Sequence, residues 1–404
     1  MRTAALVLGV LLAASPAAAQ LPDHPISNAS GTFTVGAEVS ASLTKKDEAA
    51  YFNYTDYDND ALRMFRVRLL AEARPHPRFS LVGELRDGTA TGVEVAALFA
   101  RWRPSASVNL DIQAGRIPPV IGAFSRRAYG RDNPLIGLPL AYQYLTSLRP
   151  DALPLTVDDL LRMRGRGWRP SYPLGSDSIA PGIALVAAFH WDTGLSAHWA
   201  NDVVDVAAAV TRGAPAVPLM QTRDTNNGVQ FSARAAVHLP AGLTLGTSVA
   251  RGDWLRQSVV DLKPLAGGVS LAQTLAGIDG TFERGHVILR GEFLHTSFGL
   301  PIANAPAFTA PVTADAGFVE ARYRFLTRWQ VAARVERLTF SRVQGTLFDG
   351  APTPWDAPVT RVEAVAGFRI ARTLELRGGY QYNWRNGGRV HELGFPTAQL
   401  LYWF

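Results

Sequence analysis

Residues 32–43 read TFTVGAEVSASL and alternate strictly between apolar and polar side chains. The apolar positions run from Phe33 to Leu43, and the positions between them hold Thr, Gly, Glu and Ser. Alternation with a period of two predicts a β-strand that has one apolar and one polar face. Because the polar face includes the acid Glu38, the pattern is typical of a membrane barrel strand, which faces lipid on one side and a wet lumen on the other.

The same alternation recurs along the chain, for example at 108–114, 229–239 and 374–382. From it we predict sixteen strands, at residues 32–43, 62–74, 78–87, 92–103, 107–116, 194–200, 203–211, 228–239, 242–251, 269–283, 286–296, 315–326, 329–340, 358–371, 373–384 and 394–404. An even number of strands brings both termini to the periplasmic side of a barrel. An extra strand at 182–190 would shift the pairing and give eighteen.

The connections between these strands alternate between short turns and long loops. Short turns lie at 75–77, 104–106, 240–242, 283–285 and 326–328. The longer loops lie at 44–60, 117–193, 212–227, 252–268, 297–314, 341–357 and 385–393. Short turns on one rim and long loops on the other are the pattern of outer-membrane barrels. We therefore predict an all-β fold, one transmembrane antiparallel β-barrel over residues 20–404 with long extracellular loops.

The N-terminus MRTAALVLGVLLAASPAAA, residues 1–19, reads as a signal peptide. Arg2 supplies the positive region, residues 4–14 are apolar, and residues 17–19 fit an A-x-A cleavage site. Beyond it, no apolar run approaches the roughly 18–20 residues of a transmembrane helix. A barrel is the other structure that satisfies the backbone in lipid, so we predict the outer membrane of a Gram-negative bacterium as the location.

Composition excludes several classes of protein. The chain of 404 residues is 47% hydrophobic and 18% charged, which is too apolar for a disordered protein. It has no cysteine, and this excludes disulfides, thiolate metal sites and cysteine nucleophiles. The net charge of +6 fits anionic solutes or an anionic surface, whereas nucleic acid is no partner for a secreted barrel.

The chain ends in AQLLYWF, residues 398–404, which places Leu400, Tyr402 and Phe404 on one face of the last predicted strand. A C-terminal Phe, an aromatic residue two positions earlier and an alternating apolar tail resemble the sorting signal that the barrel-assembly machinery reads. We therefore expect these three side chains to face lipid and to act as an assembly signal.

Four further stretches carry a family resemblance. They are QAGRIPPVIG (113–122), AAAVTRGAP (207–215), ARAAVHLPAGLTLGTSVARG (233–252) and GIDGTFERGHVILRGEF (277–293), the last followed by WQVAARVERL (329–338). They resemble the phosphate-selective porins O and P, loosely and over most of the chain after the signal. The resemblance implies a passive pore of 16 strands that forms a homotrimer. It does not extend to that family's lysine-rich phosphate sites, because lysine occurs here at positions 45, 46 and 263 alone.

Charged residues fill the predicted lumen face of five consecutive strands between residues 286 and 384. They are Arg290, Glu292, Glu320, Arg322, Arg324, Arg334, Glu336, Arg361, Glu363, Glu375 and Arg377. Every one of these strands offers both signs, so neighbouring strands could pair in a salt-bridge ladder that keeps the barrel round. Alternatively, the same residues form one side of a charged constriction in the pore. The two interpretations are compatible.

The loop at 117–193 is the longest, and a loop of that length in a compact fold is usually functional. From its place after the fifth strand we predict that it folds inward and narrows the pore. Arg116 directly precedes it, and Arg126, Arg127 and Arg131 follow early in it. Because guanidinium groups suit carboxylate and phosphate, we predict that these residues line a constriction with moderate anion preference.

Two features of this loop bear on its structure. The segment LTVDDLLRMRG, residues 155–165, predicts a short helix capped by Thr156. The basic segment RMRGRGWRP, residues 162–170, has glycine spacing that we expect to keep it flexible. An alternative for the loop is a surface position where its arginines bind lipopolysaccharide phosphates.

The sequence therefore predicts a passive diffusion channel for small hydrophilic solutes, anionic or neutral. It contains no G-x-S-x-G, H-E-x-x-H or P-loop motif, and we expect no enzyme, cofactor or metal site. The first-loop aromatics Tyr51, Phe52, Tyr54 and Tyr57 are expected in the outer aromatic girdle. The alternative is a non-conducting barrel that serves as scaffold, adhesin or enzyme.

Overall fold

The computed structural model describes residues 25–45, 47, 52–53, 62–87, 92–123, 129–187, 191–218, 228–262, 270–301 and 310–404. The predicted signal peptide at 1–19 lies outside the described residues, as do Arg126 and Arg127. Among the described residues, no helix is both long and apolar enough to cross a membrane.

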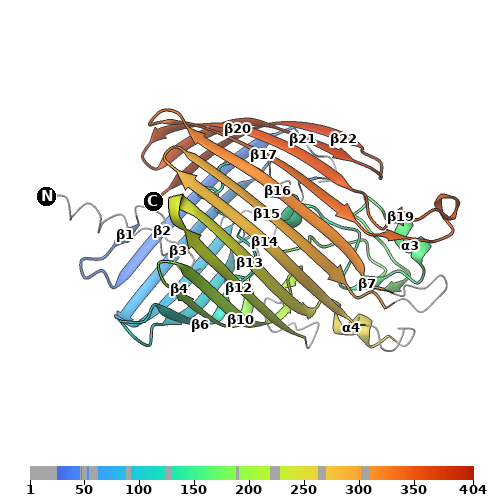
Figure 1. Cartoon of the computed structure of the whole chain (residues 1–404), viewed down its shortest axis with the longest axis horizontal. Coiled ribbons are helices and arrows are strands. Elements are labelled where there is room, and N and C mark those ends of the chain that lie inside the picture. Colours follow the sequence, from blue (N-terminus) through green and yellow to red (C-terminus); the bar gives the residue numbers. More distant parts are fainter. Residues whose placement is uncertain are drawn as a thin grey trace.

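Sixteen antiparallel strands form one closed barrel, as predicted (Figure 1). They are β2 (Phe33–Thr44), β3 (Phe65–His76), β4 (Phe79–Asp87), β5 (Glu94–Trp102), β6 (Leu110–Ile117), β9 (Asp192–Ala200), β10 (Val204–Ala214), β12 (Val229–Leu239), β13 (Leu243–Asp253), β14 (Ala272–Arg284), β15 (Val287–Phe298), β16 (Val312–Arg324), β17 (Trp329–Phe340), β20 (Val359–Ala371), β21 (Leu374–Arg385) and β22 (Glu392–Trp403). Each strand pairs with its neighbours, and β22 pairs with β2 to close the barrel. The described residues 182–187 form no strand, so the alternative of eighteen strands is wrong.

Shorter elements lie in the connections. They are β1 (Ile26–Ser27), α2 (Leu140–Gln143), β7 (Ala152–Leu153), α3 (Val157–Arg162), β8 (Leu174–Gly175), β11 (Val217–Pro218), η2 (Pro240–Gly242), α4 (Gln257–Val260), β18 (Arg342–Val343), η3 (Phe348–Gly350) and β19 (Thr353–Pro354). Figure 1 shows β1 and the C-terminus at one end of the barrel and α3, α4, β7 and β19 at the other. The long loops therefore gather on the rim opposite the C-terminus.

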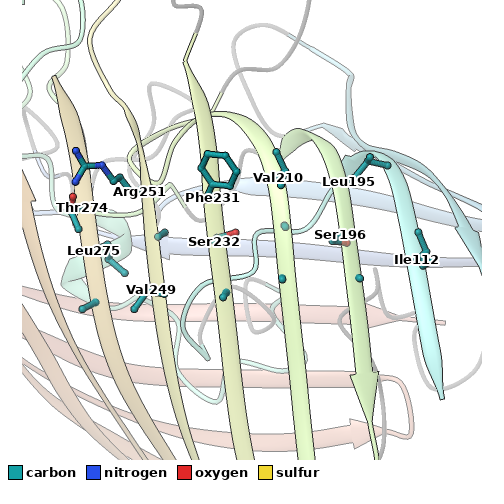
Figure 2. A pocket seen from close by; sticks show the side chains of 16 residues that line it. Ile112, Leu195, Ser196, Val210, Phe231, Ser232, Val249, Arg251, Thr274 and Leu275 are labelled. Carbon is teal, nitrogen blue, oxygen red and sulfur yellow. The ribbon is translucent and has the colours of Figure 1, made fainter. Parts of the chain in front are cut away.

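The outward face of the strands is apolar and exposed. Phe231, Ile278 and Val319, on three different strands, expose 62%, 62% and 68% of their surface. A shallow apolar hollow in this face spans β6, β9, β10, β12, β13 and β14, with Leu195 and Phe231 among its labelled side chains (Figure 2). Such an apolar belt is stable only against lipid, which identifies the barrel as a transmembrane one.

Aromatic rings mark the rim on the side of the C-terminus. The rings of Trp329 and Phe368 lie 4.6 Å apart, and those of Tyr402 and Phe404 lie 6.1 Å apart. Leu400 and Tyr402 are exposed on the outward face, and the backbone of Phe404 bonds that of Ala37. The structure thus places the proposed assembly signal at the lipid-facing seam where the barrel closes.

The inward face is polar towards this rim and apolar towards the other one. On β17 the inward residues Arg334 and Glu336 are followed by the buried Leu338 and Phe340. The apolar part belongs to a large buried cluster that also contains loop residues such as Trp355. Phe52 is fully buried in the same cluster, so its predicted place in the outer girdle is wrong. Tyr51, Tyr54 and Tyr57 lie outside the described residues.

Candidate functional site

The loop between β6 and β9 turns into the barrel and is bonded by its backbone to glutamates of the wall. Glu363 on β20 accepts hydrogen bonds from the backbone N–H groups of Ile136 and Gly137 at 3.0 and 2.7 Å. Glu336 on the neighbouring β17 accepts one from Leu140 at 2.6 Å. Carboxylates that receive backbone N–H groups hold a segment firmly, because charged acceptors make stronger hydrogen bonds. The prediction that this loop folds into the barrel is therefore confirmed.

Three more wall carboxylates hold earlier and later parts of the loop. Glu38 on β2 accepts the backbone N–H groups of Gly130 and Arg131 at 2.8 and 3.2 Å. The remaining two accept tyrosine hydroxyls: Tyr129 donates to Glu84 at 2.6 Å and Tyr142 to Glu292 at 2.7 Å. These five glutamates come from strands on both sides of the seam where the barrel closes. The loop is thus fastened across a wide part of the wall.

Arginines of the same wall bind the carbonyl groups of the loop. Arg334 donates to Gly137 O at 3.0 Å, and Arg361 donates to Leu138 O at 3.1 Å. Arg377 donates to Gly130 O at 2.9 Å and to Asn133 O at 2.7 Å. Donors and acceptors of the loop backbone are both satisfied by wall side chains, although the segment has little regular structure.

Gly137 is a point of close approach between the loop and the wall. A Cβ atom at this position would lie 2.6 Å from both Gln381 Nε2 and Glu363 Oε2. With a larger residue here, the side chains of Gln381 and Glu363 or the loop itself would have to shift. The glycine is needed here for close approach.

The charged wall residues also form the ion-pair ladder that the sequence predicts. The fully buried Arg334 lies 3.4 Å from Glu320, 3.1 Å from Glu336 and 3.1 Å from Glu363. Arg290 pairs with Glu320 at 3.6 Å. Arg322 is half-buried nearer the C-terminal rim. Glu292, Glu336, Glu363, Arg334, Arg361 and Arg377 of this ladder are buried and bonded to the loop, whereas Arg290 and Arg322 are partly exposed and Arg324 is exposed.

The four arginines that were predicted to line a constriction do not share one environment. Arg116 is buried and donates to the backbone carbonyls of Trp191 and Val95, which ties together the strands at the two ends of the loop. The Arg131 guanidinium lies 3.4 Å from Asp132 and 5.4 Å from the Tyr129 ring centre. Arg126 and Arg127 lie outside the described residues, so their place in a constriction stays a prediction.

The outer part of the loop is fixed as well. Helix α3 begins after Thr156, whose side chain forms the predicted cap with Asp159. The buried Asp356 accepts backbone N–H groups of Ser147 and Gly165 at 2.6 and 2.7 Å. Burial raises the pKa of the Asp356 carboxyl, although these hydrogen bonds favour its charged form. Gly165, within the basic segment 162–170, is thus bonded to a carboxylate of another loop, and the flexibility of the segment stays a prediction.

The wall opposite the anchors carries smaller side chains. Ser196, Ser232 and Ser248 face inward from β9, β12 and β13, and Arg234 pairs with Asp279 at 2.7 Å. Among the residues that the structure describes, no group of three or more His, Asp or Glu side chains is placed to hold a metal ion. Ser248 accepts the backbone N–H of the loop residue Gly122 at 3.2 Å, so the loop also reaches this side of the barrel.

One His–Asp pair lies on the outward face of the barrel wall, and no sequence motif predicted it. His295 on β15 and Asp315 on β16 are direct cross-strand partners, and His295 Nδ1 lies 2.7 Å from Asp315 Oδ1. Both side chains are exposed on the outward face. Within the described part of the chain, no serine hydroxyl bonds this imidazole.

No protein-family model matches the sequence, and neither does any curated protein. Solved structures match it through the fold. An anion-selective porin from Comamonas acidovorans aligns with a TM-score of 0.55 at 10% identity, over 92% of this chain and 99% of that porin. OmpF of Salmonella typhi in complex with daunomycin aligns with a TM-score of 0.54 at 11% identity, over 94% and 100%. OmpT expressed in the outer membrane of Vibrio cholerae aligns at 0.53 and 10% identity, over 94% and 100%. The chain thus has the barrel fold of these outer-membrane proteins.

Proposed function

We propose that this protein is an outer-membrane porin, a passive diffusion channel for small hydrophilic solutes. The observation that carries the proposal is the long loop, whose backbone Glu336 and Glu363 hold inside the barrel. A loop held inside the lumen narrows it without a moving part, which is how a channel limits solute size. The similarity in fold to an anion-selective porin and to OmpF supports this function.

Liposome swelling tests the proposal. Liposomes that contain the folded protein should swell in isotonic solutions of small neutral sugars, and the rate should fall steeply as sugar size increases. Liposomes with heat-denatured protein provide the control. Equal swelling with and without folded protein, for every sugar, would contradict a diffusion channel.

We further propose that the channel prefers anions moderately. Five inward glutamates (Glu38, Glu84, Glu292, Glu336 and Glu363) are used to hold the loop. Meanwhile Arg162, Arg166 and Arg169 are exposed at the loop end of the barrel. Two charges 4 Å apart interact by about 4 kcal/mol at an effective dielectric constant of 20, against about 1 kcal/mol in water. Positive charge in a narrow throat therefore acts more strongly than positive charge at the rim.

Replacing Arg126, Arg127 and Arg131 together with glutamine should shift the zero-current potential of the channel in a salt gradient towards cation preference. The shift is expected because these residues lie in the sequence between Ala123 and Gly137, which are both bonded to inward glutamates. The shift should shrink at high salt as the Debye length falls below roughly 8–10 Å. The matched control replaces Arg162, Arg166 and Arg169, which are exposed outside. A wild-type channel that already prefers cations, or an equal shift in the control, would contradict the assignment.

We propose that the N-terminal 19 residues are a cleaved signal peptide and that the barrel-assembly machinery inserts the chain. Deleting Phe404, or replacing it with serine, should lower the amount of folded barrel in outer membranes. The reason is that Phe404 ends the strand that closes the barrel against β2. The gel-mobility difference between heated and unheated samples measures this amount. Unchanged assembly would count against the sorting signal. The control is Phe325→Ser, which replaces another exposed aromatic residue on the same rim.

We propose contacts with lipopolysaccharide at the loop end and a homotrimeric assembly. One Vibrio cholerae OmpT structure of similar fold is described in a trimer form, which supports the second proposal. Membership of the porin O and P family also remains a proposal, based on the sequence motifs. Chemical cross-linking of the protein in native membranes distinguishes a trimer from a monomer.

A second candidate function is a non-conducting barrel with hydrolytic activity at the lipid interface. The pair His295–Asp315 favours it, because a carboxylate that orients an imidazole is part of nucleophilic catalysis. Hydrolysis of a fluorogenic phospholipid ester that is lost in His295→Ala would support this candidate. Equal, background-level turnover in both proteins would remove it.

A further inference from the structure

We propose that the barrel carries an anion-binding site at the rim that bears the C-terminus, built for a phosphate group with two negative charges. The site is a small hollow of ≈ 40 Å³ between the β3–β4 turn, the start of β4 and the end of β5. Its charged lining consists of Arg74, Arg78, Arg101, Arg103 and Glu72. It shares no residue with the five glutamates that hold the loop.

Arg101 is the central residue of this hollow. Its side chain is 9% exposed, and its Nη1 lies 3.6 Å from Glu72 Oε1. Its Nε and Nη2 atoms are buried and have no hydrogen-bond partner among the described residues. A buried donor without a partner is costly, and a guanidinium group with two free donors presents the fork that binds two oxygens of one oxyanion.

The neighbouring acids are already engaged by other arginines. Glu72 Oε2 accepts from Arg74 Nη2 at 2.7 Å. Asp111 is bound by Arg103 through Nε at 2.6 Å. Neither acid therefore accepts a hydrogen bond from the two free donors of Arg101.

Charge fixes the class of ligand. Four arginines face two carboxylates, those of Glu72 and Asp111, which leaves two positive charges uncompensated. His76 Nδ1 accepts the backbone N–H of Arg78 at 3.1 Å and so holds the β3–β4 turn. A dianionic group such as phosphate balances the site, and Arg74 and Arg103, each about half exposed, leave it open to an entering ligand.

Binding of inorganic phosphate to the folded full-length protein in detergent micelles tests the proposal. Calorimetric titration should give saturable binding to wild type, and Arg101→Gln should weaken it roughly tenfold or more, because a hydrogen bond to a charged group contributes about 1.5–3 kcal/mol. Arg103→Gln, at a half-exposed position, should weaken binding without affecting folding. Arg372→Gln, an exposed arginine in the β20–β21 turn, is the control and should bind as wild type does.

A second arm identifies the source of the phosphate group. In lipid nanodiscs, phosphatidic acid that displaces inorganic phosphate from wild type assigns the site to a lipid headgroup, whereas phosphate binding that is unaffected by this lipid assigns it to a soluble phosphate. No saturable binding from either source would overturn the proposal, as would Arg101→Gln and Arg103→Gln proteins that bind as wild type does. Because binding is measured without ion flow, its failure would leave the channel function untouched.

Discussion

Replacing Glu336 and Glu363 together with alanine should give a channel with larger and noisier single-channel currents than wild type. The change removes the acceptors for the backbone N–H groups of Ile136, Gly137 and Leu140. Each such hydrogen bond to a charged group contributes about 1.5–3 kcal/mol, so the middle of the loop loses most of its attachment to β17 and β20. A loop released there no longer narrows the lumen steadily, and bilayer recordings measure the result as conductance and current noise.

The matched control is the double replacement of Asp279 and Asp111 with alanine. It removes the same number of inward carboxylates, and each of these is paired with a wall arginine rather than with the loop. Currents in the control should keep the low noise of wild type. If both double variants changed conductance and noise equally, the effect would be one of charge alone, and the anchoring role would be wrong.

Replacing Arg334 with methionine should destabilise the barrel more than any other single change on the wall. Arg334 is fully buried and lies within 3.4 Å of Glu320 and 3.1 Å of Glu336 and Glu363. Its loss leaves three buried carboxylates without their shared counter-charge, and breaking a buried pair in this way costs about 3–5 kcal/mol. The concentration of urea at which the folded barrel loses its fast gel migration should fall accordingly.

Arg337→Met provides the comparison on the same strand. Arg337 points outward and is exposed, so its replacement should leave the unfolding midpoint nearly unchanged. Equal loss of stability in the two variants would mean that the buried charge cluster does not stabilise the fold. A quadruple variant, in which Glu320, Glu336 and Glu363 are replaced by glutamine in addition to Arg334→Met, should recover part of the loss.

The barrel could be predicted from the sequence because the alternation that indicates each strand lies within that strand's own residues. A strand with lipid on one side and water on the other must alternate, and segments such as 229–239 carry that alternation in every residue. The number and order of strands followed from counting these segments. The cap at Thr156 was predictable for the same reason, since it depends on Asp159 three residues later.

The attachment of the loop could not be predicted, because it joins backbone atoms that carry no sequence signal. The bond from Leu140 N–H to Glu336 spans 196 positions, and any residue except proline offers the same N–H. The charged residues of the wall could be identified from the sequence. Their hydrogen bonds to the loop could not, because these bonds depend on the path that the loop takes. The error at Phe52 has a similar origin, because an aromatic residue near a strand end fits a lipid girdle and a buried loop cluster equally well.

The site at Arg101 also depended on the register of three strands. Arg101 lies opposite Ser80 on β4 and Gln113 on β6. These pairings place it beside Glu72 but give it fewer hydrogen-bond acceptors than its guanidinium group has donors. Alternation predicts that Arg101 faces inward, but it does not predict which acids are already occupied by Arg74 and Arg103.

Planar-bilayer recording of the purified wild-type protein tests the central claim most directly. With the folded state verified by gel mobility, the protein should insert in discrete conductance steps that need no voltage trigger, with a zero-current potential in a salt gradient on the anion side. Folded protein that inserts into the bilayer and gives no conductance above that of the lipid alone would contradict the claim that this barrel is a channel.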